Sequence, residues 1–170
     1  MMAAALTLLR LGAADRDLFL FDTFAGMTRP TDADRDYTGA RVLPTWLRYQ
    51  EDASDPAAVG VDAVRDALVG TGYDPGLVHL VEGPVEHTLP GGAPERIALL
   101  RLDTDCYEST RHELEHLYPR LAPGGVLIID DYGHFQGARR ATDEYFAGRP
   151  LLLARVDYTA RIAVKPGAGA

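Results

Sequence analysis

The chain has 170 residues, of which 46% are hydrophobic and 25% are charged, and this is the balance of one globular domain with its own core. Its net charge of -8 argues against a nucleic-acid partner, because phosphate binding depends on clustered Lys and Arg. The single cysteine, Cys106, excludes an internal disulfide and a cysteine-based zinc cluster, so we expect a cytoplasmic protein.

The first residues of the chain, 1–9, are apolar and are followed by Arg10. This run is far shorter than the roughly 20 residues of a membrane span. It therefore predicts a buried helix, and we expect no membrane partner.

Four short apolar runs follow along the chain, and each ends at an acidic or small polar residue. Continuous apolar runs of this length are typical of parallel strands that are covered on both faces. The expected strands are residues 18–21, 78–81, 97–102 and 126–129. Amphipathic stretches predict helices at residues 61–68, 109–121 and 139–146. Residues 151–156 and 160–164 predict a final antiparallel pair. The alternation predicts an α/β fold in a single domain that spans residues 1–170.

Residues 26–59 interrupt this alternation. The segment is rich in Asp, Arg and Pro and shows no clear hydrophobic period. A long segment of this kind inside a compact domain is usually functional, so we predict a substrate lid.

Acidic residues follow the expected strands directly, as a group of five: Asp22, Glu82, Asp103, Asp130 and Asp131. The carboxyl ends of parallel strands meet at one edge of a sheet, and ligands bind beyond that edge. One crossover helix separates the strands that end at Asp103 and Asp130, so these strands are expected to be neighbours about 5 Å apart.

Carboxylates gathered in one partly buried place repel each other, and such a site must take up protons or hold a cation. A set of oxygen ligands favours Mg²⁺, Ca²⁺ or Mn²⁺ over zinc. Asp103, Asp130 and Asp131 are the candidate ligands. The alternative is that each Asp only caps a helix or satisfies a loop.

The acidic motifs and their surroundings resemble the macrocin O-methyltransferase family, which methylates sugars of antibiotics such as mycinamicin and novobiocin. The segments that match, over nearly the whole chain, are residues 21–27, 83–90, 100–110, 117–132 and 137–146. The resemblance implies a Rossmann-like class I methyltransferase sheet, mostly parallel with a carboxyl-terminal antiparallel strand. Members of the family begin with a strand and a glycine-containing loop, and residues 1–11 correspond to the helix after that loop. The resemblance therefore implies an amino-terminally truncated form of the fold.

The same resemblance assigns roles to the candidate residues. Asp103, Asp130 and Asp131 would hold Mg²⁺, and Asp105 would be the general base. A metal acidifies a coordinated hydroxyl, and a nearby carboxylate can then take its proton. Asp22 would accept hydrogen bonds from the ribose of S-adenosylmethionine, or cap its own turn instead. Gly83 would let the backbone approach the adenine, or serve only as a turn glycine.

The implied function is O-methylation of a hydroxyl on a sugar or another small secondary metabolite. The expected partner is a small-molecule acceptor such as a glycoside or natural product, and a homo-oligomer is left open. One alternative is a truncated, non-catalytic binding module of the same fold.

A second alternative is a zinc metalloprotease, because residues 112–116 read His-Glu-Leu-Glu-His. The helical period places His112 and His116 opposite the apolar stripe of their helix, so we expect both to face water.

Overall fold

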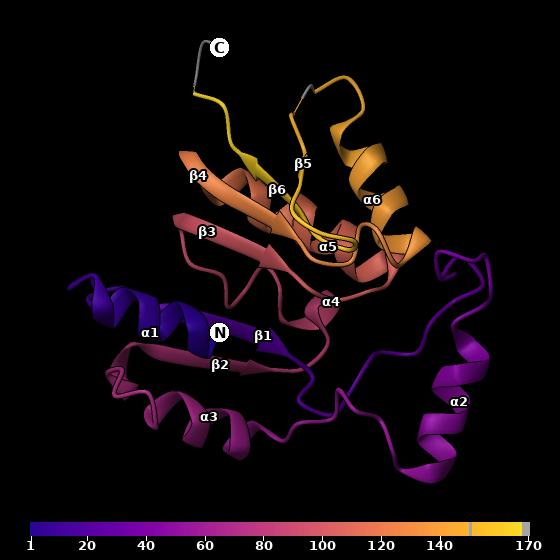
Figure 1. Cartoon of the computed structure of the whole chain (residues 1–170), viewed down its shortest axis with the longest axis horizontal. Coiled ribbons are helices and arrows are strands. Elements are labelled where there is room, and N and C mark those ends of the chain that lie inside the picture. Colours follow the sequence, from indigo (N-terminus) through magenta and orange to yellow (C-terminus); the bar gives the residue numbers. More distant parts are fainter. Residues whose placement is uncertain (150, 168–170) are drawn as a thin grey trace.

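The structure is a computed structural model that describes residues 1–149 and 151–167 (Figure 1). Strands and helices alternate as an α/β fold requires. The strands are β1 (Leu18–Asp22), β2 (Val78–Glu82), β3 (Ile97–Leu102), β4 (Leu121–Ile129), β5 (Ala154–Arg155) and β6 (Arg161–Val164). The helices are α1 (Met2–Arg10), α2 (Leu43–Asp52), α3 (Val61–Val69), α4 (Val85–Thr88), α5 (Tyr107–Leu117) and α6 (Gln136–Phe146). Short 3₁₀ turns, η1 (Pro75–Leu77) and η2 (Tyr118–Arg120), precede β2 and β4.

The strands form two hydrogen-bonded groups. β1 pairs with β2 in parallel, and the second group has the order β3-β4-β6-β5. Within it β3 and β4 are parallel, whereas β6 runs antiparallel to both β4 and β5. The expected parallel strands and the antiparallel carboxyl-terminal pair are therefore confirmed. In residues 1–149 and 151–167, no ladder joins β1 to β3.

Each group of strands has its own hydrophobic cluster. The larger one joins β3 and β4 to α5, and its fully buried members include Leu102, Leu114 and Leu127. The smaller one packs α1 and α3 on β1 and β2 around Leu18 and Leu68. The carboxyl ends of β1, β2, β3 and β4 all point to the same side of the molecule (Figure 1).

Two sequence expectations about helices need correction. The helix over residues 1–9 exists as α1, but only Ala5 is buried, because a single face of the helix lies against α3 and β1. The helix expected over 109–121 ends at Leu117, and η2 follows it. Pro119 has no N–H to continue the α-helical ladder, and Leu121 already belongs to β4.

The segment 26–59 contains α2, which its sequence did not reveal. Pro44 stands in the first turn and Ala53 ends the helix in a left-handed conformation. No residue of α2 is buried, which explains why its sequence lacks an apolar stripe. The helix lies beyond the carboxyl ends of the strands (Figure 1). Within the described residues, no helix is long and apolar enough to cross a membrane.

Candidate functional site

The acidic rim is formed by the ends of two paired strands. Leu102 of β3 lies opposite Ile129 of β4, so Asp103 and Asp130 leave the sheet side by side. The Asp130 N–H donates to the carbonyl of Leu102 at 3.0 Å and holds the two strand ends together. The expectation that these strands are neighbours is confirmed.

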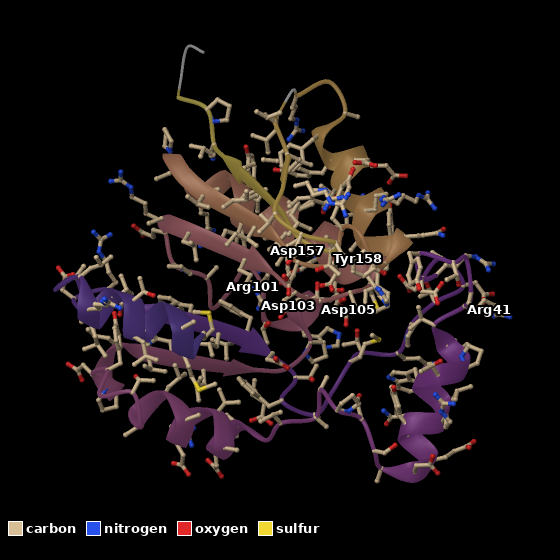
Figure 2. All side chains as sticks on the ribbon, in the orientation of Figure 1. Arg41, Arg101, Asp103, Asp105, Asp157 and Tyr158 are labelled. Carbon is tan, nitrogen blue, oxygen red and sulfur yellow. The ribbon has the colours of Figure 1, made fainter. Side chains whose placement is uncertain are left out.

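Arg101 lies within this rim, and the sequence reading did not single it out. Its guanidinium donates to Asp103 at 2.6 Å and to Asp130 at 2.5 Å. Figure 2 shows Arg101, Asp103 and Asp105 together at the carboxyl end of β3. A charged residue inside the apolar run 97–102 was the signal available in the sequence.

Burial and crowding change the acidity of the rim. Desolvation, aided by hydrogen bonding to Asp130, raises the pKa of Asp103, and Arg101 opposes the shift. Desolvation and the charge of Asp131 raise the pKa of Asp105. Desolvation also raises the pKa of Asp131, whose Oδ2 is buried without a hydrogen-bond partner. A buried carboxylate oxygen without a hydrogen-bond partner is stabilised when it takes up a proton or binds a cation.

The carboxylates are close but do not yet form a metal centre. In the part of the chain that the structure describes, no three His, Cys, Asp or Glu side chains converge to hold a metal ion. Instead, the Arg101 guanidinium spans Asp103 and Asp130.

Residues 103–106 form a tight turn after β3. Asp105 has a positive φ of 64°, which is uncommon for a residue with a side chain. The Cys106 N–H donates to the carbonyl of Thr104 at 2.6 Å, and the Thr104 hydroxyl donates to Glu113 of α5 at 2.8 Å. The sequence reading missed Thr104 and Glu113, because their contact joins two different elements.

A cavity of about 100 Å³ opens beside this turn. It brings together four of the predicted site residues, Asp22, Gly83, Asp103 and Asp105. Asp130 and Asp131 do not line it. Gly26, Met27, Thr28 and Ala57 of the segment 26–59 also form part of its wall.

The two predicted cofactor residues lie at neighbouring strand ends. Asp22 and Glu82 pair across β1 and β2, and the Gly83 N–H donates to the carbonyl of Asp22 at 2.9 Å. One oxygen of Asp22 accepts from the Phe24 N–H at 2.8 Å, so Asp22 does cap its own turn. Gly83 has a φ of 133°, which only glycine adopts easily, and this supports its reading as a turn glycine.

The histidines of the zinc motif do not face water as expected. Both are half-buried, their rings contact each other with centroids 4.3 Å apart, and Glu113 between them is buried. The prediction was wrong because α5 packs on two sides, against α6 and also against α4. A His112 ring nitrogen lies 3.4 Å from the carbonyl of Leu89, which follows α4.

The family model for macrocin O-methyltransferase (TylF) matches residues 1–162. The chain belongs to the macrocin O-methyltransferase family. It is 36% identical over 134 residues to a tetracenomycin-C rhamnosyl 4'-O-methyltransferase of Streptomyces olivaceus, with 79% of this chain and 48% of that protein covered. It is 34% identical over 131 residues to mycinamicin III 3''-O-methyltransferase of Micromonospora griseorubida, with 77% and 49% covered.

Among solved structures, the O-methyltransferase NovP superposes with a TM-score of 0.78 at 26% identity, over 98% of this chain and 69% of NovP. This macrocin O-methyltransferase family member therefore has the Rossmann-like fold of class I O-methyltransferases. The chain spans about half the length of the curated relatives it matches. Its membership of the family leaves no support for the zinc metalloprotease alternative.

Proposed function

We propose that the protein takes part in O-methylation of a hydroxyl on a sugar or another small natural product, with S-adenosylmethionine as the methyl donor. The observation that supports this most is the cavity in which Asp22 and Gly83 face Asp103 and Asp105. These are the residues that the family resemblance assigns to cofactor binding, metal binding and proton transfer. The family's relatives are named for methylation of tetracenomycin and mycinamicin.

Asp22 and Gly83 are proposed to bind the nucleoside part of the cofactor. Asp22 is exposed beside the cavity, and its cap to Phe24 uses only one of its two carboxylate oxygens. The other oxygen is available to accept a ribose hydroxyl. A cavity of about 100 Å³ is smaller than the roughly 300 to 1,000 Å³ of typical ligand sites. A wall of the cavity would therefore have to move for the cofactor to enter, and we propose that residues 26–28 of the predicted lid are that wall.

Asp103, Asp130 and Asp131 are proposed to hold a hard divalent cation such as Mg²⁺. The donor chemistry fits, because the three side chains offer carboxylate oxygens and Asp131 Oδ2 is buried without a partner. Arg101 would have to leave Asp103 and Asp130. When bound, the cation would acidify an acceptor hydroxyl and oppose the negative charge that raises the pKa of Asp105.

Asp105 is proposed to accept the proton of the acceptor hydroxyl. It lines the cavity with Asp103 and lies beside Asp131. As the oxygen forms its bond to the methyl carbon, the carbon–sulfur bond of the sulfonium breaks and the electron pair stays on sulfur. Holding the attacking oxygen in line with the methyl carbon and the sulfur, with the base within hydrogen-bond reach of the hydroxyl, makes this transfer effectively intramolecular.

A second candidate is a binding module without catalysis. The absence of a ladder between β1 and β3 in the described residues favours it, because the sheet beneath the cavity is not continuous. Such a module would bind Mg²⁺ but not the cofactor.

Calorimetric titration with S-adenosylhomocysteine in the presence of Mg²⁺ tests the proposal. We expect Asp22→Ala to weaken binding by about tenfold, the effect of losing a charged hydrogen-bond acceptor. Asp17→Ala is the matched control, since Asp17 is exposed, pairs with His79 and does not line the cavity. A folded chain that binds Mg²⁺ but no S-adenosylhomocysteine would support the binding module instead. A panel of unmethylated antibiotic glycosides would then test methyl transfer itself.

A further inference from the structure

Glu113 is a buried acid that the proposed reaction does not use. Its side chain is on α5 beneath the acidic rim, and the residue is only 5% exposed. Burial, with smaller contributions from the charges of Glu86, Asp103 and Asp131, raises its pKa to about 8, whereas its bond to Thr104 opposes the shift. A buried carboxyl is costly unless it makes hydrogen bonds, and the Thr104 hydroxyl donates one to Glu113.

Thr104 is held to α5 through its hydroxyl and its backbone carbonyl. Its hydroxyl donates to Glu113 at 2.8 Å, and its carbonyl lies 3.2 Å from the hydroxyl of Ser109, which donates to it. Ser109 is 2% exposed. Ser109 and Glu113 are four residues apart, so they lie on one face of the helix, a turn from each other. The turn after β3 is thereby fixed to α5 at two points.

The residue that follows Thr104 is in a strained conformation. Asp105 has a φ of 64°, a left-handed backbone conformation that is unfavourable for most residues with a side chain. Such strain persists where the surrounding structure over-determines it. Here the residues on either side of Asp105 are both fixed by hydrogen bonds. The Thr104 hydroxyl donates to Glu113, and the Cys106 N–H donates to the carbonyl of Thr104. Asp105 lies near Asp103 and Arg101 in Figure 2.

We propose that Glu113 is a positioning residue, which acts through the Thr104 hydroxyl to keep the 103–106 turn closed and the Asp105 carboxylate at the acidic rim. The importance of that position for methyl transfer rests on the proposed function. The hydrogen-bond role itself does not. Glu113, the second residue of the His-Glu-Leu-Glu-His sequence, would thus support the proposed methyltransferase site from helix α5.

Amide hydrogen exchange of Cys106, followed by NMR, reads the turn directly. Glu113→Ala and Thr104→Val each remove the bond, and we expect exchange at Cys106 to become about tenfold faster in both. The double variant should exchange no faster than the quicker single variant, because both changes break one interaction. Glu113→Gln keeps an oxygen that accepts from Thr104, so it should exchange within about twofold of the wild type.

Leu117→Ala is the matched control, because Leu117 is buried in the core at the other end of the same helix from the 103–106 turn. It should lower the free energy of unfolding. The exchange rate of the Cys106 amide, relative to the rates of neighbouring core amides, should stay unchanged. If Glu113→Ala fails to fold, Thr104→Val tests the same bond from the other side. Exchange at Cys106 that stays at the wild-type rate in Thr104→Val, or that rises as much in Glu113→Gln as in Glu113→Ala, overturns the proposal. A wild-type chain that binds no S-adenosylhomocysteine overturns the proposed function alone, since exchange needs no ligand.

Discussion

Arg101 occupies the place where a divalent cation is proposed to bind. Its guanidinium contacts Asp103 and Asp130 at once, and these side chains are 37%, 46% and 32% exposed. Ion pairs that water reaches to this extent contribute at most about 1 kcal/mol each. The arginine can therefore hold the carboxylates together and still be displaced.

Removing this internal cation should strengthen metal binding. We expect Arg101→Met to raise the affinity for Mg²⁺ by about two- to fivefold at low ionic strength, because the metal no longer competes with a guanidinium. Isothermal titration with MgCl₂ measures the change. Arg111→Met removes the same charge from an exposed pair with Glu115 on α5 and should leave the affinity unchanged. Weaker binding by Arg101→Met would show that the arginine supports the site and does not compete for it.

Glu113 also makes the stability of the fold depend on pH. Its pKa rises from 4.5 to about 8 on folding, so the folded state favours the neutral acid. That stabilisation is complete below about pH 4.5 and is lost as the pH rises through about 8. In metal-free buffer, the unfolding free energy of the wild type should fall between pH 5 and 9 by a few kcal/mol more than that of Glu113→Gln, which cannot ionise.

Denaturant titrations at several pH values measure this difference. Glu115→Gln is the control, because Glu115 is exposed on the same helix and pairs with Arg111. Parallel pH profiles for the wild type and Glu113→Gln would contradict the prediction.

Among the elements, the base of segment 26–59 is anchored by a buried acid. Asp34 is 2% exposed, and one of its oxygens accepts from the Tyr107 N–H at the start of α5 at 2.8 Å. The other oxygen accepts from the backbone and side chain of Thr31 at 2.7 and 2.8 Å. A negative charge at the beginning of a helix is favourable, so the contact joins the candidate lid to α5.

Asp34→Ala should detach this base. It leaves a buried N–H of α5 without a partner, and we expect a loss of about 2 to 4 kcal/mol in unfolding free energy. Segment 26–59 should also become more sensitive to limited proteolysis. The control is Asp32→Ala, two residues before Asp34 in the chain, which removes an exposed ion pair with Arg41. It should cost less than about 0.5 kcal/mol in unfolding free energy. Equal losses in the two variants would mean that the buried contact is not the anchor.

In the molecule as a whole, two hydrophobic clusters lie under two groups of strands that no ladder joins in the described residues. Such parts of a fold can open separately, with different free energies. Leu68 and Leu127 are each 1% exposed and belong to different clusters, which makes them a matched pair.

Leu68→Ala should accelerate amide exchange in β1 and β2 and leave β4 largely protected, whereas Leu127→Ala should do the reverse. Each change removes about 2 to 5 kcal/mol of packing from its own cluster. Hydrogen exchange with mass spectrometry distinguishes the two patterns. Equal acceleration throughout the chain for both variants would show that the molecule unfolds as one unit.

The local sequence determined most of the elements. The apolar runs at 18–21, 78–81, 97–102 and 126–129 all became parallel strands, as short apolar runs of this length predict. Not all of them are buried on both faces, because Leu99 and Arg101 of β3 are exposed. The acidic residues that end those runs predicted the edge of the sheet where the candidate cavity lies, and Asp22 and Asp103 line that cavity. The helix α2 escaped prediction, since a helix without a buried face needs no apolar period. The roles of the predicted site residues stay predictions, and so do the lid role of segment 26–59, the use of S-adenosylmethionine and Mg²⁺, the single domain, the cytoplasmic location and the assembly. Those site residues are Asp22, Gly83, Asp103, Asp105, Asp130 and Asp131.

Tertiary structure alone decided which polar and charged side chains contact each other. Arg101 stands out in the sequence as a charge inside an apolar run, but its partner Asp130 lies on another element. The contact of Thr104 with Glu113 likewise joins two elements and is encoded in neither alone. Whether a histidine on α5 meets water or a neighbouring helix likewise depends on the packing of α4, which no period within α5 encodes. Hydrophobic period is a property of one element, whereas the partner of a polar side chain depends on which elements pack together.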